Sequence, residues 1–430
     1  MTNAKILIVA NFTGNETMKN RFINIANLLA NKGFDVEVIT SDFSHGSKKQ
    51  KDFGSPKLNF KITRIHEPGY TSNVSPTRLY SHYVWGKNVF KYIKSMKIKP
   101  DLIYCAVPSL TAPNLLGKYC KRNKINFITD IQDLWPEAFE LLIKNNILKK
   151  LLFKPFHKYA NKAYKYSDLI IGVSETYMKR GLSSCVSGYD SSSPKKHLNN
   201  EETLLNNKGL TIYLGNDLNQ FDKAKNIIDL IKPEDEFWIG YIGTLGYSYD
   251  IKCVIDSISF LKEKHNIKNI KFIVMGSGPL KEEFQNYAIK KNINVEFTGP
   301  LPYDKMVANL CKCNIVVNPI VKGGAQSITN KVGDYAFSGV PVVNTQPNRE
   351  YRNLLEQFNC GINCEVGDAK QMSDAILKIY KNPQLKNILG KNGRRLGEER
   401  FDRNKTYPIL IDKIETIING NKSNNTTPSY

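Results

Sequence analysis

The segment from Asn318 to Thr345, NPIVKGGAQSITNKVGDYAFSGVPVVNT, combines residue types that can bind phosphate. A predicted strand leads through a loop with Gly323 and Gly324 into a predicted helix with Lys331 and Asp334 in its first turns. Glycine lets the backbone approach a ligand closely, and a helix N-terminus offers free N–H groups and a positive dipole end. The lysine would add charge, and the aspartate could accept hydrogen bonds from a ribose. An ordinary strand-to-helix turn with a surface lysine and aspartate also fits.

A second candidate site is the sequence DLWPE, which follows a predicted strand. Asp133 and Glu137 flank its aromatic–proline turn, and either carboxylate could polarise a hydroxyl group there. Alternatively, Asp133 caps the following helix and Trp135 packs in the core. In the first predicted strand-to-helix loop, Gly14 and Asn15 either line the same site or form a plain helix-entry turn.

Two series of alternating strands and helices must position these segments. Such alternation is typical of parallel sheets built from βαβ units, which bind ligands at the carboxyl ends of their strands. The predicted fold class is therefore α/β, with two Rossmann-like, doubly wound domains that face each other across a cleft. The predicted strands lie over 5–10, 36–40, 102–106, 126–130 and 169–173 in the first series, and over 238–242, 271–275, 294–298, 315–318 and 340–344 in the second.

The predicted domain boundaries follow from breaks in this alternation. Residues 1–217 form an N-terminal domain, in which the serine-rich stretch 182–209 lacks apolar periodicity and is expected to be a flexible insertion. Residues 218–402 form the second domain. A helix over 403–419 is expected to cross back to the N-terminal domain, and the tail 420–430 is expected to be disordered.

Composition narrows the class of protein. The 430 residues exceed what one core usually supports, and 41% hydrophobic residues suffice for two. No run approaches the roughly 18 apolar residues of a membrane span, and the apolar run 6–10 is too short for a signal peptide, so we expect a cytoplasmic protein. The eight cysteines form no CxxC pair with a matching histidine cluster, so reduced thiols and no metal site are expected.

The net charge of +21 indicates an anionic partner. The run 78–99 has six basic and no acidic residues among aromatics, and the run 139–166 has seven lysines beside apolar pieces. Both suit the anionic inner face of a membrane, which predicts a peripheral membrane protein, but each also fits a core helix with a solvated lysine face. No recognisable module supports nucleic-acid binding.

The glycine loop and helix followed by SGVPVV resemble the donor-site signature of glycosyltransferase family 4, the retaining enzymes of GT-B fold. The resemblance covers nearly the whole chain and implies an acceptor-binding first domain and a nucleotide-sugar-binding second domain. Five further segments fit the family in order, of which the first two resemble capsule and O-antigen members: ITDIQDLWPE (128–137), IIGVSETYMK (170–179), YIGTLGYSYDIKCVIDSI (241–258), FIVMGSGPLKEEF (272–284) and VEFTGPLPYDKM (295–306).

The resemblance also implies roles for individual residues. Gly243 and Gly246 would let the sugar diphosphate approach the backbone, Leu301 would lie against the base, and Asp334 would hold the ribose. Backbone N–H groups at 327–329 would bind the phosphates. The implied donor-binding residues are Gly243, Thr244, Gly246, Gly276, Gly278, Leu301, Lys322, Gly323, Gly324, Ser327, Ile328, Thr329 and Asp334.

Several positions depart from the family pattern. The first of its two glutamates falls on Gln326, which can hydrogen-bond a sugar hydroxyl but supplies no charge, and the second is an aspartate. The usual basic pair falls on Thr244 and Tyr249, so we expect Lys322 and Lys331 to replace those cations. The family's acceptor-side histidine is absent. The acceptor-side candidates are therefore Gly14, Asn15, Asp130, Gln132 and Glu137, and the catalytic candidates are Asp133, Gln326 and Lys331.

The resemblance implies transfer of a hexose-type residue, with or without an N-acetyl group, from a UDP-linked donor with retention of configuration. The implied acceptor is a saccharide on a polyprenyl diphosphate, in capsule, O-antigen or other cell-surface polysaccharide synthesis. No metal or other cofactor is expected, in agreement with the broken DxD pattern at 130–132. The departures leave a second interpretation open: a catalytically weak GT-B homologue that binds nucleotide sugar or supports a partner enzyme.

Overall fold

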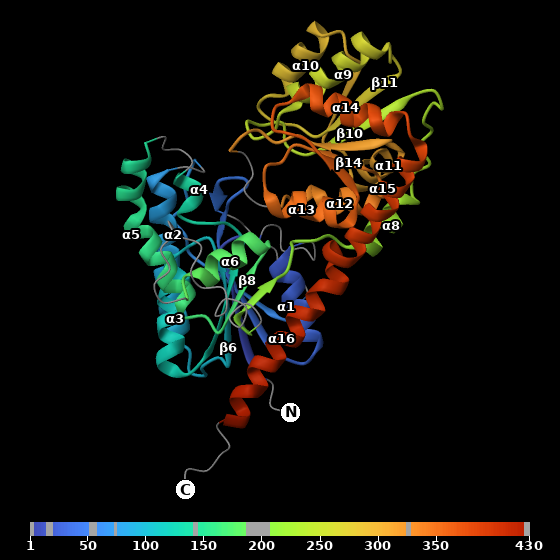
Figure 1. Ribbon diagram of the computed structural model, residues 1–430. Coiled ribbons are helices and arrows are strands. Elements are labelled where there is room, and N and C mark those ends of the chain that lie inside the picture. The colour runs from blue at the N-terminus through green and yellow to red at the C-terminus, as the bar shows by residue number, and fades with distance from the viewer. Residues whose placement is uncertain are drawn as a thin grey trace. The chain divides into compact units, whose positions relative to one another are not determined.

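The computed structural model describes residues 4–13, 20–50, 58–72, 75–140, 145–185, 207–323 and 328–424. The chain divides into two compact units, here called unit 1 (1–212 with 407–430) and unit 2 (213–406). Each unit is a parallel sheet with helices on both faces (Figure 1), so the predicted α/β class with two doubly wound domains is confirmed. Residues 186–206 of the predicted insertion and residues 425–430 of the tail lie outside the described part.

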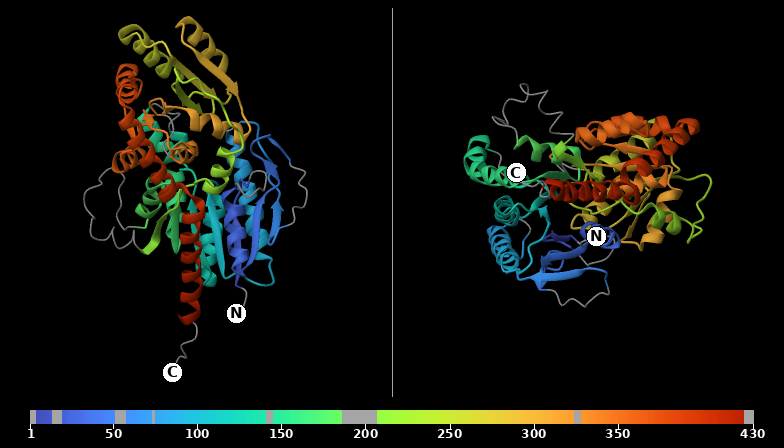
Figure 2. Two further views of the ribbon diagram at one scale, coloured as in Figure 1. Left: turned by 90° about the vertical axis from the view of Figure 1, so that its right-hand side faces the viewer. Right: turned by 90° about the horizontal axis from the view of Figure 1, so that it is seen from below.

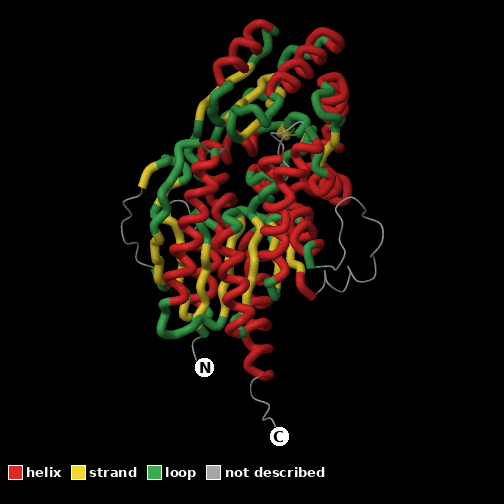
Figure 3. Tube along the Cα trace, turned by 90° about the vertical axis from the view of Figure 1, so that its left-hand side faces the viewer, coloured by secondary structure: helices red, strands yellow, loops and turns green. Residues whose placement is uncertain are grey.

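Unit 1 contains a seven-stranded sheet in the order β5-β2-β1-β6-β7-β8-β9, and every pairing in it is parallel. Its strands are visible as adjacent yellow segments in Figure 3. The strands are β1 (Lys5–Val9), β2 (Asp35–Ser41), β5 (Lys61–Ile65), β6 (Leu102–Val107), β7 (Asn126–Ile131), β8 (Leu169–Gly172) and β9 (Gly209–Thr211), beside a small hairpin of β3 (Phe43–Ser44) and β4 (Lys49–Gln50).

Successive side chains of each strand point to opposite faces of this sheet, and a separate hydrophobic core lies on each face. In β1, Ile6 and Ile8 enter one core with α1 and α16, whereas Leu7 and Val9 enter the other with α2 and α3. Helix α5 packs on the outside of α3. The helices of this unit are α1 (Arg21–Asn31), α2 (Pro76–Lys94), α3 (Thr111–Asn123), α4 (Glu137–Glu140), α5 (Asn146–Lys165) and α6 (Glu175–Ser183), together with most of α16 (Arg403–Asn424).

Helix α16 begins in unit 2 and completes the core of unit 1. Its residues Tyr407, Leu410, Ile411 and Ile414 are almost fully buried against the sheet, at the spacing of one helix face. The red helix runs along unit 1 in both views of Figure 2. An ion pair between Lys32 and Asp412 (2.9 Å) adds a contact at its exposed side.

Unit 2 contains a six-stranded parallel sheet in the order β12-β11-β10-β13-β14-β15. Helices α9, α10 and α14 cover one face, and α8, α11, α12 and α13 cover the other (Figure 1). The strands are β10 (Phe237–Ile242), β11 (Ile270–Met275), β12 (Val295–Gly299), β13 (Ile315–Asn318), β14 (Val342–Asn344) and β15 (Gly361–Asn363). The helices are α8 (Leu218–Lys225), α9 (Ile251–His265), α10 (Lys281–Lys290), α11 (Tyr303–Lys312), α12 (Lys331–Ser338), α13 (Arg349–Phe358), α14 (Ala369–Tyr380) and α15 (Pro383–Leu396), which continues into the π-helical turn Gly397–Phe401.

Within the part of the chain that the structure describes, no helix has both the length and the apolar character that crossing a membrane requires.

Candidate functional site

Two glycine turns pack against each other at the carboxyl ends of β10 and β11 in unit 2. Gly243 has φ +136° and Gly276 has φ +153°, both in the region that only glycine adopts readily. A Cβ atom at Gly276 would lie 1.9 Å from the Gly243 carbonyl oxygen, and one at Gly278 would lie 2.3 Å from that of Leu245. The backbones therefore touch directly, which any larger residue would prevent. Gly246 has no such constraint, because its nearest neighbouring atom would lie at 3.6 Å.

The first glycine turn also holds the segment that follows β13. The Asp250 N–H donates to the Pro319 carbonyl (3.2 Å), and the Val321 N–H donates to the Ser248 carbonyl (3.1 Å). These bonds fix the start of the loop that carries Lys322 and Gly323, both of which are exposed. The sequence placed these two segments in one donor site, and the structure brings their backbones together.

Lys331 is the most unusual side chain of unit 2. It is only 8% exposed, and its Nζ has no hydrogen-bond partner among the residues that the structure describes. The Nζ lies 4.2 Å from the ring centre of Tyr241 and 4.1 Å from that of Tyr249. Burial lowers the pKa of Lys331 well below its usual value. Two aromatic faces attract the ammonium form without supplying a negative charge, so an anion bound beside it would favour the charged form that burial disfavours.

This ammonium lies beside the glycine turn. A Cβ atom at Gly243 would be 3.5 Å from the Lys331 Nζ, and the Thr329 hydroxyl two residues earlier is buried without a partner among the described residues. Lys331 is also the first residue of α12, and the Val332 and Gly333 N–H groups of its first turn already donate to the carbonyls of Thr329 (3.2 Å) and Asn330 (3.3 Å). The feature of this site that suits a phosphate is therefore the buried Lys331 side chain, which lies next to a backbone that has no side chain.

Packing on two sides fixes the orientation of α12. The buried Tyr335 hydroxyl accepts from the Ile242 N–H (3.0 Å) and donates to the Val317 carbonyl (3.1 Å), which ties the helix to β10 and β13. Asp334 accepts a hydrogen bond from the Tyr303 hydroxyl of α11 (2.9 Å), and the nearby carboxylate raises the pKa of Tyr303 further than burial alone. Asp334 is almost buried, so its orientation is set before any ligand binds.

The remaining donor-site predictions fall in different places. Leu301 is half-buried against the core beneath α11 and α12, Ile328 is buried, and Thr244 is exposed on the glycine turn. Gly324, Gln326 and Ser327 lie outside the described residues, so their predicted roles stay predictions.

In unit 1, Asp130 is fully buried at the end of β7. Its carboxylate accepts from Arg21 Nε (2.8 Å), the Tyr104 hydroxyl (2.5 Å) and Gln132 Nε2 (2.7 Å). Arg21 also donates to the carbonyl of Ile212, the residue that follows β9, which joins this part of the chain to the same network. These bonds give both Asp130 and Gln132 a place in the internal network of this unit, and their acceptor-side roles stay predictions. Gly14 and Asn15 lie outside the described residues.

The DLWPE segment forms a turn after β7. The Leu134 N–H donates to Asp133 Oδ1 (2.9 Å), and burial raises the pKa of Asp133. A raised pKa brings a carboxylate closer to the basicity that proton transfer requires. Glu137, at the start of α4, is paired with Arg180 and lies 3.7 Å from His157. Asp133 is therefore better suited than Glu137 to meet a hydroxyl group, as its predicted catalytic role requires.

Sequence reasoning missed the side chains on α2 that surround Trp135. The His82 ring stacks on the Trp135 ring with centres 5.0 Å apart, and the Arg78 guanidinium carbon lies 4.8 Å from the Trp135 ring centre. Both ring nitrogens of His82 are buried without a hydrogen-bond partner among the described residues, and burial lowers the pKa of His82 to about 3. The four-residue spacing of Arg78 and His82, which places them on one helix face, was the available signal.

Comparison with known proteins gives a family match for most of unit 2. Residues 222–396, almost all of unit 2, match the model of the family "Glycosyl transferases group 1". An uncharacterized glycosyltransferase of Methanocaldococcus jannaschii is 23% identical over 265 residues, which is 60% of this chain and 61% of that protein. A second one from the same organism is 23% identical over 398 residues, which is 82% of this chain and 94% of that protein.

Solved structures extend the likeness to both units. Sucrose-phosphate synthase from Thermosynechococcus elongatus superimposes with a TM-score of 0.69 at 14% identity and covers 97% of this chain and 100% of that one. The Anabaena HepE protein, solved with UDP, gives a TM-score of 0.64 at 13% identity over 96% of this chain and 100% of that one. The fold is therefore GT-B, as predicted. Within it, unit 2 carries a group 1 glycosyl transferase domain.

Proposed function

We propose that this protein is a retaining glycosyltransferase of family 4 type that transfers a hexose residue from a UDP-linked donor to a lipid-linked saccharide. The buried side chain of Lys331, which has no hydrogen-bond partner among the described residues, lies beside Gly243 and carries the proposal. A protein that only had to fold would gain nothing from a charge that no described residue compensates, because burial without a partner is costly. A diphosphate bound over the glycine turn would supply the missing partner.

The site explains the departures from the family pattern. The basic pair expected after the glycine turn is replaced at its second position by Tyr249, whose ring faces the Lys331 ammonium. The cation therefore comes from α12 instead of from the glycine turn. Asp334, held by Tyr303, would accept hydrogen bonds from the ribose hydroxyls.

In the proposed reaction the bond between the anomeric carbon and the diphosphate oxygen breaks, and a bond from that carbon to the acceptor oxygen forms on the same face. The proton of the acceptor hydroxyl passes to the departing phosphate oxygen, so the products are the glycoside and the nucleoside diphosphate. Lys331 would stabilise the negative charge that develops on the leaving group. No metal is assigned in this proposal.

The choice of UDP and of a saccharide acceptor is supported by relatives. The Anabaena HepE protein was also solved with UDP-glucose. A putative glycosyltransferase, EpsD, of Bacillus subtilis is 25% identical over 185 residues, and the capsular polysaccharide biosynthesis glycosyltransferase CapM of Staphylococcus aureus is 25% identical over 193. We propose synthesis of a capsule or another cell-surface polysaccharide as the corresponding role.

The proposed location is the inner face of the membrane. Helix α5 exposes Ile147 (81%) and Leu151 (74%) among lysines, and α2 exposes Tyr80 (63%) two residues after Arg78. Apolar side chains that alternate with lysine on a helix surface suit an anionic lipid headgroup layer. This arrangement supports a peripheral membrane enzyme whose acceptor is carried on a polyprenyl diphosphate.

One observation favours a weaker function. The first glutamate of the family pattern is Gln326 here, so the site lacks one negative charge that would stabilise an oxocarbenium ion. A homologue that binds the nucleotide sugar and supports a partner enzyme would need no such charge. Turnover distinguishes the two candidates, whereas donor binding does not.

Donor hydrolysis and thermal shift test the proposal together. A true donor at 100 times its Kd should stabilise the protein by about 2.7 kcal/mol, so a panel of nucleotide sugars should single out one or a few. The purified protein should also release UDP slowly from that donor, and Lys331→Met should abolish the release. Stabilisation without UDP release, even with membrane extract as acceptor, would favour the binding homologue. If the protein shows neither stabilisation by a nucleotide sugar nor UDP release, both candidates are contradicted.

A further inference from the structure

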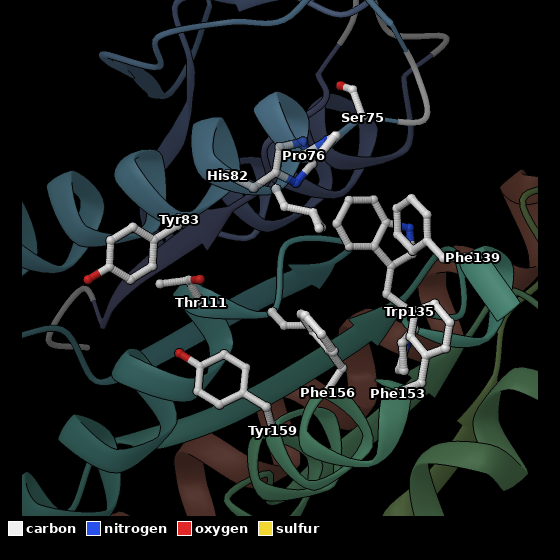
Figure 4. Close-up of a pocket in the computed structure, with 13 residues that line it drawn as sticks. Ser75, Pro76, His82, Tyr83, Thr111, Trp135, Phe139, Phe153, Phe156 and Tyr159 are labelled. Atoms are coloured by element: carbon white, nitrogen blue, oxygen red, sulfur yellow. The ribbon is translucent and has the colours of Figure 1, made fainter. Parts of the chain in front are cut away.

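Unit 1 contains an apolar pocket of about 590 Å³ that the donor site does not use. It lies among α2, the start of α3, the DLWPE turn and α5. Figure 4 shows the ring of Trp135 with Phe139 and Phe153 at one side and Tyr83 with Tyr159 at the other. The volume is within the range of roughly 300–1,000 Å³ of ligand sites. Its aromatic walls offer few partners for sugar hydroxyls, whose burial without hydrogen bonds is unfavourable.

The lining continues into an exposed apolar stripe on α5. Ile147, Leu148, Leu151 and Leu152 precede the pocket residue Phe156 and occupy one side of the helix at spacings of one, four and five residues. Each of the four is at least 48% exposed. Leu148 and Leu152 precede Phe156 at four-residue spacing, so this row of exposed apolar side chains runs along α5 towards the pocket, and exposed apolar surface of this kind marks an interaction site.

The charge around this path suits a phosphate-linked chain. Helices α2 and α5 contain no acidic residue, and basic residues occur along both of them. Lys149, Lys154 and Lys158 lie on the same helix as the apolar stripe. Anionic lipid headgroups at the membrane surface would meet these lysines while the apolar tail of the acceptor lies against the leucines.

We propose that this pocket binds the apolar chain of the lipid-linked acceptor, which enters along α5 from the membrane. The proposal rests on the proposed function, because that function supplies a lipid-linked acceptor. Trp135 forms one wall, and Asp133 precedes it by two residues in the same turn. A chain held against Trp135 would therefore bring its phosphate-linked saccharide to the candidate catalytic carboxylate of unit 1.

The test uses farnesyl diphosphate, a soluble isoprenoid, and the full-length protein. The wild type should bind it at least 30-fold more tightly than inorganic diphosphate, and the fluorescence of Trp135 should change on binding. Phe156→Glu and Leu79→Glu place a charge in the lining at positions that are 42% and 37% exposed, and each should weaken binding at least tenfold. The matched control Ile289→Glu, at a 76% exposed position on α10, should bind like the wild type.

Three outcomes would overturn the proposal that this pocket binds the apolar chain of the acceptor. Farnesyl diphosphate could bind no better than inorganic diphosphate, both lining variants could bind like the wild type with unchanged melting temperatures, or the protein could bind anionic vesicles but no soluble chain. The last result would indicate surface docking alone. Dodecyl phosphate that binds as tightly as farnesyl diphosphate would support the pocket and show that it accepts a straight chain as well.

Donor binding on the same samples separates this inference from the proposed function. Stabilisation by a UDP-sugar with no farnesyl diphosphate binding would overturn the pocket and leave the transferase proposal standing. Farnesyl diphosphate binding that Phe156→Glu abolishes, without stabilisation by any nucleotide sugar, would support the pocket and contradict the transferase.

Discussion

Replacement of Lys331 by methionine should weaken UDP binding and stabilise the fold at the same time. Two unit charges 4 Å apart attract by about 4 kcal/mol at an effective dielectric constant of about 20. Part of this attraction is offset by desolvation of the diphosphate, which leaves about 2–3 kcal/mol. At 1.4 kcal/mol per tenfold, UDP should bind Lys331→Met about 30- to 150-fold more weakly than the wild type.

The expected gain in stability has a separate cause. Methionine keeps the length of lysine and removes a buried polar group without a described partner, a group whose burial costs about 1–3 kcal/mol. The lost attraction between the ammonium and the rings of Tyr241 and Tyr249 is worth up to about 2 kcal/mol, of which sulfur–aromatic contacts recover about 0.3–1.5 kcal/mol. A net gain of about 1 kcal/mol should raise the melting temperature by roughly 2–4 °C.

The pH dependence gives an independent measurement. Because burial lowers the pKa of Lys331 in the folded protein, the unfolded chain binds the additional proton between the folded pKa and the ordinary value of 10.5. The burial penalty is therefore complete below the folded pKa and shrinks as pH rises towards 10.5, so the advantage of Lys331→Met should shrink with it. UDP requires the ammonium form, so its affinity for the wild type should fall as pH rises through the folded pKa.

Isothermal titration with UDP and thermal melts over a pH series measure both effects. Lys378→Met, which removes an exposed lysine on α14, should change neither quantity. Unchanged UDP affinity with a lower melting temperature would refute the reasoning, because it would mean that Lys331 only holds the two tyrosine rings together.

Three further substitutions test other parts of the structure. Gly276→Ala should lower the free energy of unfolding in urea by about 3 kcal/mol or more, because its Cβ would meet the Gly243 carbonyl oxygen at 1.9 Å. The control Gly246→Ala should change it by no more than about 1 kcal/mol, and equal losses for the two variants would contradict the proposed turn packing. Asp130→Asn breaks the buried pair with Arg21 and should cost about 3–5 kcal/mol by the same method, and a loss below about 1 kcal/mol would show that the pair is dispensable. Asp133→Asn removes the carboxylate proposed to polarise the acceptor hydroxyl and should slow transfer about 10²- to 10⁴-fold at unchanged UDP affinity, and full activity would exclude Asp133 from that role.

The pattern of the sequence determined the fold class and most strand positions. The strand predicted over 271–275 corresponds to β11 (Ile270–Met275), and that over 238–242 to β10 (Phe237–Ile242). Strands of a parallel sheet are buried on both faces, so they occur as short apolar runs that any local reading detects. The glycine positions could also be predicted from the sequence, because the positive φ angles at Gly243 and Gly276 directly restrict which residue type can occupy them.

Tertiary structure alone decided the chemical environment of the candidate residues. In the sequence, Tyr249 stands where the family pattern has a basic residue. In the structure its ring contacts the side chain of Lys331, 82 residues later, beside the glycine turn. Asp130 and Arg21 meet across 109 residues, and His82 meets Trp135 across 53. Such contacts depend on how each helix packs on its sheet, and local periodicity carries no information about that packing. The segment 318–345 therefore indicated phosphate chemistry by itself, and only the folded chain showed that its lysine is buried, uncompensated among the described residues and adjacent to the backbone of Gly243.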